Sequence, residues 1–228
     1  MNGNPTQKTR QLIELVLIGL MTLSPLTSQA ASDQQVQLWT FDAEVPGTLP
    51  RDFVVGTLFD GRPVGERKVT QTSQAPSPPH VLGQLMGKGA EHAYKLVLLK
   101  GTDSSDLDVS VSLLPIDGKA DMGGGLIWRA ADDRTYYLLR ANPLEQNLRI
   151  SRVVKGVRQM LRNFDHIIDV RQWHQLRVMM NRCQTQVFFD ERRVFDIYDD
   201  TFSHGRVGLW TKSDAIIYFI DLTLRIAR

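Results

Sequence analysis

Apolar residues in this chain recur at every second position in short runs, and turn residues separate the runs. In the clearest run, Leu107, Val109, Val111 and Leu113 alternate with Asp and Ser. A period of two places successive side chains on opposite faces, so the run predicts a β-strand with one buried face and one wet face. Similar runs predict strands at 126–129, 136–140, 148–154, 175–180, 184–190, 194–197, 205–211 and 216–226.

Turn residues such as those at 131–134 and 143–146 connect these strands at short intervals. Residues 31–228 contain no amphipathic helix of useful length, which favours an all-β sandwich or barrel. In one hairpin, at 175–190, we expect Leu176, Val178 and Met180 to face Val187 and Phe189 in the core. The stretch 46–79 is rich in Gly, Pro, Ser and Thr, and its prolines restrict it to loops and edge strands.

The first thirty residues have the pattern of a secretory signal peptide. Two basic residues precede an apolar core at 15–23. Small residues follow at Ser28 and Ala30, three and one positions before the bond to Ala31, as at a signal-peptidase site. We therefore expect a signal peptide at 1–30, cleavage near Ala30–Ala31, and a secreted or periplasmic protein. The acidic Glu14 at the edge of the core leaves an uncleaved anchor as the alternative.

Residues 31–228 have the length of one large β-sandwich domain. The whole chain has a net charge of +2, and removal of Lys8, Arg10 and Glu14 with the signal leaves about +1. So small a charge gives no general attraction to nucleic acid or to anionic membranes. No later run is apolar enough to cross a bilayer, so we expect no transmembrane span after signal cleavage. The one cysteine, Cys183, cannot form an internal disulfide.

The chain lacks the sequence patterns of several common catalytic sites. It has no G-x-S-x-G elbow for a serine nucleophile and no E-x-D-x-x-E run of a retaining β-glucanase. Its five histidines are scattered singly, which disfavours a zinc site. Asp106 and Asp108 share a strand face and suit either a carboxylate pair, a calcium ligand set or an ordinary wet face. No cofactor is evident, and a divalent metal ion stays open.

Aromatic and basic residues gather on the predicted strands in a pattern that suits sugar binding. A flat ring covers the C–H face of a pyranose while fixed donors contact its hydroxyls. The candidate ligand-binding residues are Arg129, Tyr136, Arg140, Asn142, Trp210 and Lys212. Two alternatives stay open: the face with Tyr136, Arg140 and Asn142 is either a ligand groove or an internally paired polar patch with an acid such as Glu145. At least one of Trp128 and Trp210 is expected to fill the core.

Several segments resemble the concanavalin A-like domains grouped with 3-keto-disaccharide hydrolases, which are also similar to laminin-G-like sandwiches. The resemblance covers most of residues 31–228, and its most specific parts are the boxes Tyr136–Asn142 and Gly208–Lys212. The chain departs from the pattern at 65–68, where a Trp is absent, and at Glu191, where a glycine is expected. The matching segments are 39–53, 123–158, 172–178, 187–195 and 199–222.

This resemblance implies an antiparallel two-sheet jelly-roll sandwich of the concanavalin A-like type. It also implies contact with a saccharide or polysaccharide, so an exported carbohydrate-binding module is the first functional hypothesis. The second is a hydrolase or lyase acting on 3-keto-glycosides, in which Arg140 and Asn142 orient the substrate and an Asp or His acts as base. The third is a non-catalytic adhesion or structural domain, since fold does not fix function.

Overall fold

The strands predicted from alternating apolar and polar residues belong to two antiparallel sheets that pack face to face. A computed structural model describes residues 34–58, 65–85 and 93–227, and all regular structure in these ranges is β-strand. The predicted signal peptide at 1–30 and its cleavage site lie outside the described residues. Within the described ranges there is no helix of the length and apolarity needed to cross a membrane. The all-β sandwich expected from the sequence is confirmed.

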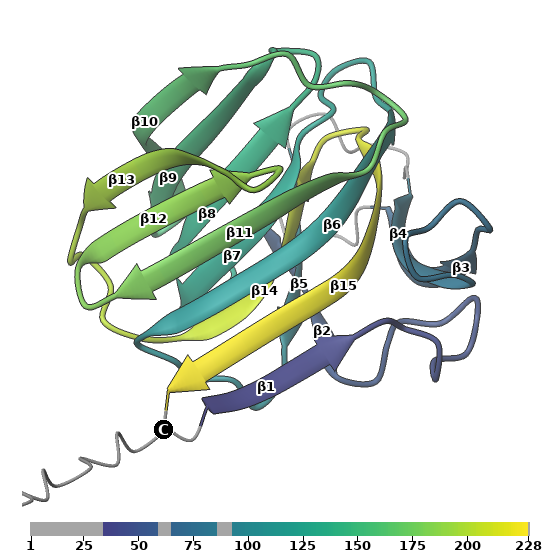
Figure 1. The fold of residues 1–228 in the computed structure, drawn as a ribbon, viewed down its shortest axis with the longest axis horizontal. Helices are drawn as coiled ribbons and strands as arrows, with labels where there is room; N and C mark the ends of the chain where they lie inside the picture. The colour runs from purple at the N-terminus through teal and green to yellow at the C-terminus, as the bar shows by residue number, and fades with distance from the viewer. Residues whose placement is uncertain (1–33, 59–64, 86–92, 228) are drawn as a thin grey trace, which may run out of the picture. The chain divides into compact units, whose positions relative to one another are not determined.

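Eight of the described strands form one sheet and seven form the other (Figure 1). The larger sheet runs in the order β13 (Arg192–Tyr198), β12 (Gln184–Phe189), β11 (His174–Asn181), β6 (Leu107–Asp117), β15 (Ile216–Ala227), β4 (His80–Leu85) and β3 (Glu66–Gln71), and β1 (Gln34–Trp39) also pairs with β15. The smaller sheet runs in the order β10 (Val157–Asp165), β9 (Asn147–Val154), β8 (Tyr136–Asn142), β7 (Gly124–Ala130), β14 (Arg206–Lys212), β5 (Tyr94–Leu99) and β2 (Phe53–Leu58).

The hairpin of β11 and β12 has the register predicted from its apolar pattern. Leu176 pairs with Phe189 and Val178 with Val187, and all four side chains are buried in the core between the sheets. A shift of one residue would turn every one of these side chains toward solvent, so burial of one face fixes the pairing. This prediction is confirmed.

The proline-rich stretch 46–79 contributes strands only at the sheet edges. It contains β2 and β3, which end the smaller and the larger sheet respectively. Its prolines at 46, 50, 76, 78 and 79 lie outside both strands, where no ladder hydrogen bond is lost. The expectation of loops and edge strands is therefore confirmed.

Four strands, β1, β4, β5 and β10, were not predicted. The last two were missed for opposite reasons. Strand β5 has the sequence Tyr-Lys-Leu-Val-Leu-Leu and is covered on both faces, so it shows no apolar alternation. Strand β10 lies at the edge of its sheet, and most of its side chains are half-buried or exposed. A strand that buries little carries no period-two signal.

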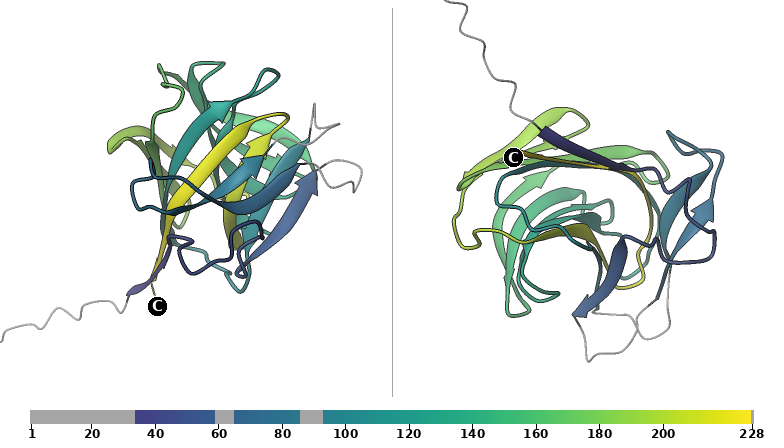
Figure 2. Two further views of the ribbon diagram at one scale, coloured as in Figure 1. Left: turned by 90° about the vertical axis from the view of Figure 1, so that its right-hand side faces the viewer. Right: turned by 90° about the horizontal axis from the view of Figure 1, so that it is seen from below.

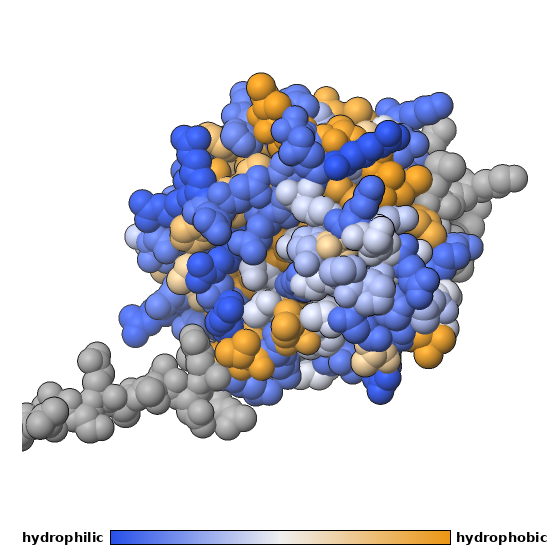
Figure 3. Space-filling view, turned by 45° about the vertical axis from the view of Figure 1, so that its right-hand side comes forward, coloured by the Kyte–Doolittle hydropathy of each residue, from blue (hydrophilic) through white to orange (hydrophobic). Residues whose placement is uncertain are grey.

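The main core lies between the sheets and draws side chains from both. Trp128 stacks on Tyr137 at a centroid distance of 5.5 Å, and both are buried. On the face seen in Figure 3 the surface is mainly hydrophilic, and its apolar residues form separate patches. Scattered apolar residues of this kind are normal for a protein surface.

The seven-stranded sheet curls strongly around the face that points away from the other sheet (Figure 2). The curl brings β10 at one edge toward β5 near the other, although β9, β8, β7 and β14 separate them in the sheet. The guanidinium of Arg158 on β10 lies over the ring of Tyr94 on β5, 5.8 Å from its centroid. We call the face enclosed by this curl the concave face.

Candidate functional site

Five of the six candidate residues lie on the concave face, on strands β8 and β14. The ladder places Arg140 opposite Gly125 of β7, and Trp210 opposite the same glycine from the other side. Position 125 requires glycine, since the Cβ of any other residue would lie 1.8 Å from the backbone oxygen of Leu139. The five are Tyr136, Arg140, Asn142, Trp210 and Lys212.

One half of the concave face is apolar and closed. Tyr136, Leu138 and Trp210 are fully buried in a second apolar cluster, separate from the core between the sheets. The ring of Tyr94 packs on Trp210 at 5.2 Å, and Arg158 covers Tyr94 from the far edge of the sheet. Burial raises the pKa of Tyr136 far above its usual range. Tyr136 and Trp210 therefore act as packing residues in this structure.

The other half of the concave face is polar and is centred on Arg140. Its guanidinium binds Glu145 with both terminal nitrogens, Nη1 to Oε1 at 2.8 Å and Nη2 to Oε2 at 3.0 Å. Nη2 also donates to Oδ1 of Asn147 at 2.7 Å. Arg149 adds a second cation, with Nη1 at 2.6 Å from Glu145 Oε2. Both terminal nitrogens of Arg140 are thus paired, while its Nε is buried without a partner among the described residues.

A buried aspartate extends these contacts to β14. Oδ1 of Asp121 accepts from the backbone N–H of Gly123 at 2.7 Å and from Nδ2 of Asn142 at 3.1 Å. Its Oδ2 lies 2.8 Å from Nζ of Lys212. Since Asn142 Nδ2 also approaches Glu145 Oε1 at 3.3 Å, the two groups are joined. We call the joined set the polar network; it comprises Asp121, Arg140, Asn142, Glu145, Asn147, Arg149 and Lys212.

The electrostatics of the polar network hold its acid in the charged form. The pKa of Glu145 falls from 4.5 to about 2, chiefly because Arg140 hydrogen-bonds the carboxylate, and burial opposes this shift only in part. A general base works best with a pKa near the working pH. Glu145 is therefore suited to binding and to structure, and poorly suited to removing a proton.

The polar network has a buried centre at Arg140 and partly exposed ends, which we call its tips, at Glu145, Arg149 and Lys212. The side chain of Arg140 is 1% exposed, whereas Glu145 is 36%, Arg149 is 28% and Lys212 is 23% exposed. The internally paired patch proposed as one alternative from the sequence is thus the arrangement observed. Its exposed tips still present donors and an acceptor to solvent.

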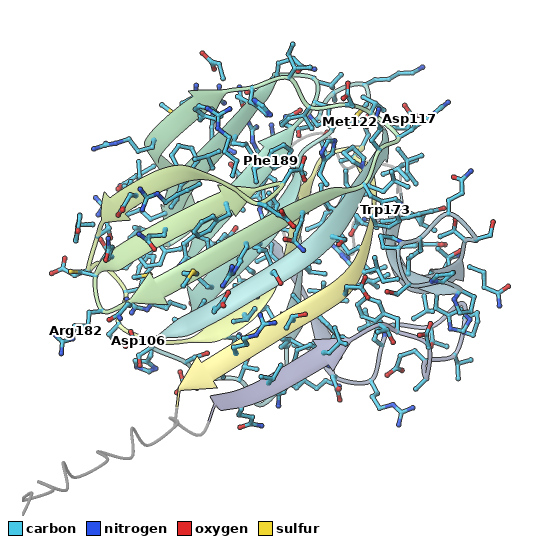
Figure 4. The ribbon with its side chains drawn as sticks, viewed as in Figure 1. Asp106, Asp117, Met122, Trp173, Arg182 and Phe189 are labelled. Atoms are coloured by element: carbon cyan, nitrogen blue, oxygen red, sulfur yellow. The ribbon has the colours of Figure 1, made fainter. Side chains whose placement is uncertain are left out.

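The sixth candidate, Arg129, lies away from the concave face. Its left-handed backbone, with φ of 48°, turns the side chain toward the loops at the end of the sheets where Asp106 and Arg182 lie (Figure 4). All three guanidinium nitrogens donate to backbone carbonyls within 2.8 Å, and burial lowers the pKa of Arg129. The accepting residues are Ser105, Phe202 and Arg182. Arg129 is therefore not brought together with the other five candidates.

Sequence reasoning missed two members of the polar network. Asp121 lies in the loop after β6 and beside Met122, at the end of the sheets opposite to Asp106 (Figure 4). Nothing in the local sequence connects it with Lys212. Asn147 had a usable signal, because it directly follows the turn 143–146 and so must pair with Asn142 across the hairpin.

Asp106, just before β6, and Asp108, on β6, both have partners within the described chain. Asp108 accepts from Nε and Nη2 of Arg177 at 2.8 and 2.7 Å. Asp106 accepts from the backbone N–H of Arg182 at 2.7 Å. Across residues 34–58, 65–85 and 93–227, no three His, Cys, Asp or Glu side chains lie in positions that could hold a metal ion.

Comparisons with known proteins agree with this architecture. No known family model matches the chain. A levanase of Bacillus subtilis is 24% identical over 129 residues, which are 55% of this chain and 19% of the levanase, so the chain spans about a fifth of that relative.

Two solved structures show the likeness in three dimensions. The carbohydrate binding module CBM66 from Bacillus subtilis has a TM-score of 0.58 and 19% identity, with 70% of this chain and 91% of that chain covered. The Bacillus licheniformis β-glucanase has a TM-score of 0.57 and 8% identity, with 85% and 98% covered. The chain therefore has the jelly-roll fold of concanavalin A-like β-sandwiches.

Proposed function

We propose that this protein is a carbohydrate-binding module whose ligand contacts the polar network. The observation that carries the proposal is the pairing of Arg140 with Glu145 and Arg149, which leaves charged tips at fixed positions on the concave face. Groups held by buried partners lose little freedom when a ligand binds, and this preorganisation favours affinity.

The exposed tips supply the contacts that a saccharide requires. Arg149 and Lys212 donate to sugar hydroxyls, and Glu145 accepts from them. Leu144 is 48% exposed next to Glu145 and offers apolar surface to the C–H face of the sugar ring. Arg140 and Asn142 act below as positioning residues, and Tyr136 and Trp210 support them from the apolar half.

The comparisons support a saccharide ligand of the fructan or glucan class. One relative is a levanase and another is a carbohydrate binding module, and both come from the same bacterium by name. The resemblance to 3-keto-disaccharide hydrolase-like domains, strongest at Tyr136–Asn142, points toward the same general class of ligand. We therefore take levan and a mixed β-glucan as the first ligands to test.

Arg149→Met tests the proposal at an exposed member of the polar network. We expect the variant to lose most of the retardation of the wild type in gels that contain levan or β-glucan, with its Tm within a few degrees of wild type. Arg193→Met is the matched control, because Arg193 is exposed on β13 of the other sheet. Equal retardation of both variants and the wild type would contradict the assignment, and no retardation of the wild type would favour a structural or adhesion domain.

A hydrolase or lyase acting on 3-keto-glycosides is the alternative function, favoured by the Tyr136–Asn142 box alone. Because the pKa of Glu145 is about 2, this acid is a poor base for removing the proton next to a ketone. We expect no release of sugar from a 3-keto-glucoside at neutral pH. Measured turnover by the wild type would instead establish the enzyme, with an Asp or His as its base.

We also propose that the protein is exported, on the pattern of residues 1–30. The expected mature N-terminus is Ala31, within two residues, in the periplasm or outside the cell. Sequencing of the N-terminus from the native host tests this. Recovery of intact Met1 in the membrane fraction would identify the segment as an anchor.

A further inference from the structure

Two further cationic side chains, the buried Lys95 and the half-buried Arg67, come from opposite sheets and play no part in the polar network. Alternation along β5 turns Lys95 toward the core side of the sheet, together with Val97 and Leu99. Lys95 is only 1% exposed. Arg67 reaches the same place from β3 of the other sheet, and both residues line one small cavity.

These cations lack partners in the part of the chain that the structure describes. Nζ of Lys95, and Nε and Nη2 of Arg67, are buried without a hydrogen-bond acceptor there. The hydroxyl of Thr211, opposite Lys95 in the ladder of β14 and β5, is buried and unpaired as well. Buried polar groups are nearly always hydrogen-bonded, and buried charges nearly always paired.

The acid whose charge acts on Lys95, Asp214, is engaged elsewhere. The carboxylate of Asp214 accepts from the backbone N–H groups of Lys119, Ala120 and Asp121 at 2.8–3.1 Å. These contacts lower the pKa of Asp214 against the opposing effect of burial. Asp214 therefore balances the positive charge from a distance and makes no contact with it.

The pKa values reflect this lack of partners. Burial, and then the charge of Arg67, lower the pKa of Lys95 from 10.5 to about 8, while Asp214 opposes the shift. Burial lowers the pKa of Arg67 from 12.5 to about 10. Both groups are still mainly protonated at neutral pH, so the cavity holds two like charges.

The cavity has room for one small ligand. Its volume is about 10 Å³, comparable to the space that a single water molecule occupies. Gly65, with φ of +73°, lies next to Lys95, because a Cβ there would lie 3.0 Å from Lys95 Nζ. Gln84 lines the cavity too, but its Nε2 donates to the carbonyl of Leu85. A water molecule would offset none of the positive charge, whereas a small monatomic anion would offset one of the two charges.

We propose that this cavity binds a small monovalent anion of the chloride class. Lys95 and Arg67 supply the charge from opposite sheets, and the hydroxyl of Thr211 supplies a third donor. The anion would join the two sheets at this end of the core, away from the concave face. The proposal does not depend on the proposed saccharide site.

Thermal melts at constant ionic strength test the proposal. We expect the Tm of the full chain to rise saturably, by about 5 °C, when sodium chloride replaces sodium gluconate, whose anion is too large for the cavity. Lys95→Met and Arg67→Met should each abolish this rise. Lys100→Met is the matched control and should keep it, because Lys100 is exposed just beyond the end of β5.

Crystals grown with bromide give a direct readout that does not depend on the stability of any variant. We expect an anomalous peak between Lys95 and Arg67 in the wild type, and none there in Lys95→Met. A Tm that responds equally to chloride in the wild type and Lys95→Met, or a wild-type cavity without bromide, would overturn the proposal.

Discussion

Arg140 and Lys95 are equally buried, and the structure treats them in opposite ways. Each side chain is 1% exposed and carries a positive charge. Arg140 meets three acceptor oxygens from Glu145 and Asn147, whereas Lys95 meets no acceptor among the described residues. Burial alone therefore does not distinguish a structural cation from one that we propose binds an anion. The number of acceptor atoms around the cation distinguishes the two.

The largest expected effect follows from removing the partner of Arg140. Glu145→Ala should lower the free energy of unfolding by about 3–4 kcal/mol, because it strands a buried guanidinium. Urea unfolding at pH 7 measures the loss. Glu66→Ala is the control, since Glu66 is 63% exposed beside Lys68 and should cost at most about 1 kcal/mol. Similar costs for both variants would mean that Arg140 does not depend on its carboxylate.

The free energy of unfolding at acid pH provides a second test of the pairing between Arg140 and Glu145. The folded pKa of Glu145 lies below its unfolded value, so its contribution is fully present above about pH 4.5 and is lost as the pH falls toward about 2. Glu145→Gln should flatten the wild-type decline across this window.

Lys95→Met should act with the opposite sign. In chloride-free buffer it should raise the free energy of unfolding by about 1–3 kcal/mol, because an apolar side chain replaces an unpaired buried charge. The same urea assay measures the gain, and chloride should reduce it by stabilising only the wild type. A loss of stability in chloride-free buffer would show that Lys95 has a partner after all.

Arg140→Lys separates the fork geometry from the charge. Lysine keeps the charge but offers one ammonium in place of two parallel donors, so we expect a loss of about 1–2 kcal/mol. The matched change is Arg177→Lys, which faces Asp108 with a similar fork but is 38% exposed. The loss for Arg177→Lys should stay below about 1 kcal/mol. A larger loss at Arg177 than at Arg140 would contradict the expectation that burial makes the paired geometry more important.

The smallest expected effect is the alkaline response of Lys95. Its folded pKa of about 8 lies below the unfolded 10.5, so the unfolded chain binds more protons between these values and stability rises with pH. We expect a gain of about 1 kcal/mol between pH 8 and pH 9 in chloride-free buffer, and none in Lys95→Met. Arg67 and Asp214 face the same region and stay charged over this step. An identical slope in the variant would assign the response to another group.

Much of the fold could be predicted because it depends on local alternation. The β11–β12 hairpin was predicted with its register, since Leu176, Val178 and Phe189 fall on one face at a period of two. Strand β10 was not, because an edge strand with exposed Val157 and Met160 has no buried face to mark it. The covered strand β5 was missed because both of its faces are buried.

The site could be predicted only in part, because its chemistry depends on long-range contacts. The pairing of Arg140 with Glu145 was open as an alternative, since the two residues flank one turn. The link from Lys212 to Asp121 joins residues far apart in sequence and left no local signal. Lys95 did leave a local signal, because it is a lone charge in an otherwise apolar strand. The curl that closes the apolar half of the concave face left no signal in the sequence.

The edge strand β10 bears on how the molecule behaves in a crowded solution. An exposed edge offers unpaired backbone groups to which another chain can add, the first step toward polymers. Here a register shift between Met160 and Arg162 interrupts the ladder of β10, and the charged side chain of Arg162 is exposed on this strand. Irregularity and repelling charge both oppose the docking of a second strand. We therefore expect this edge of the curled sheet to resist the addition of a second strand.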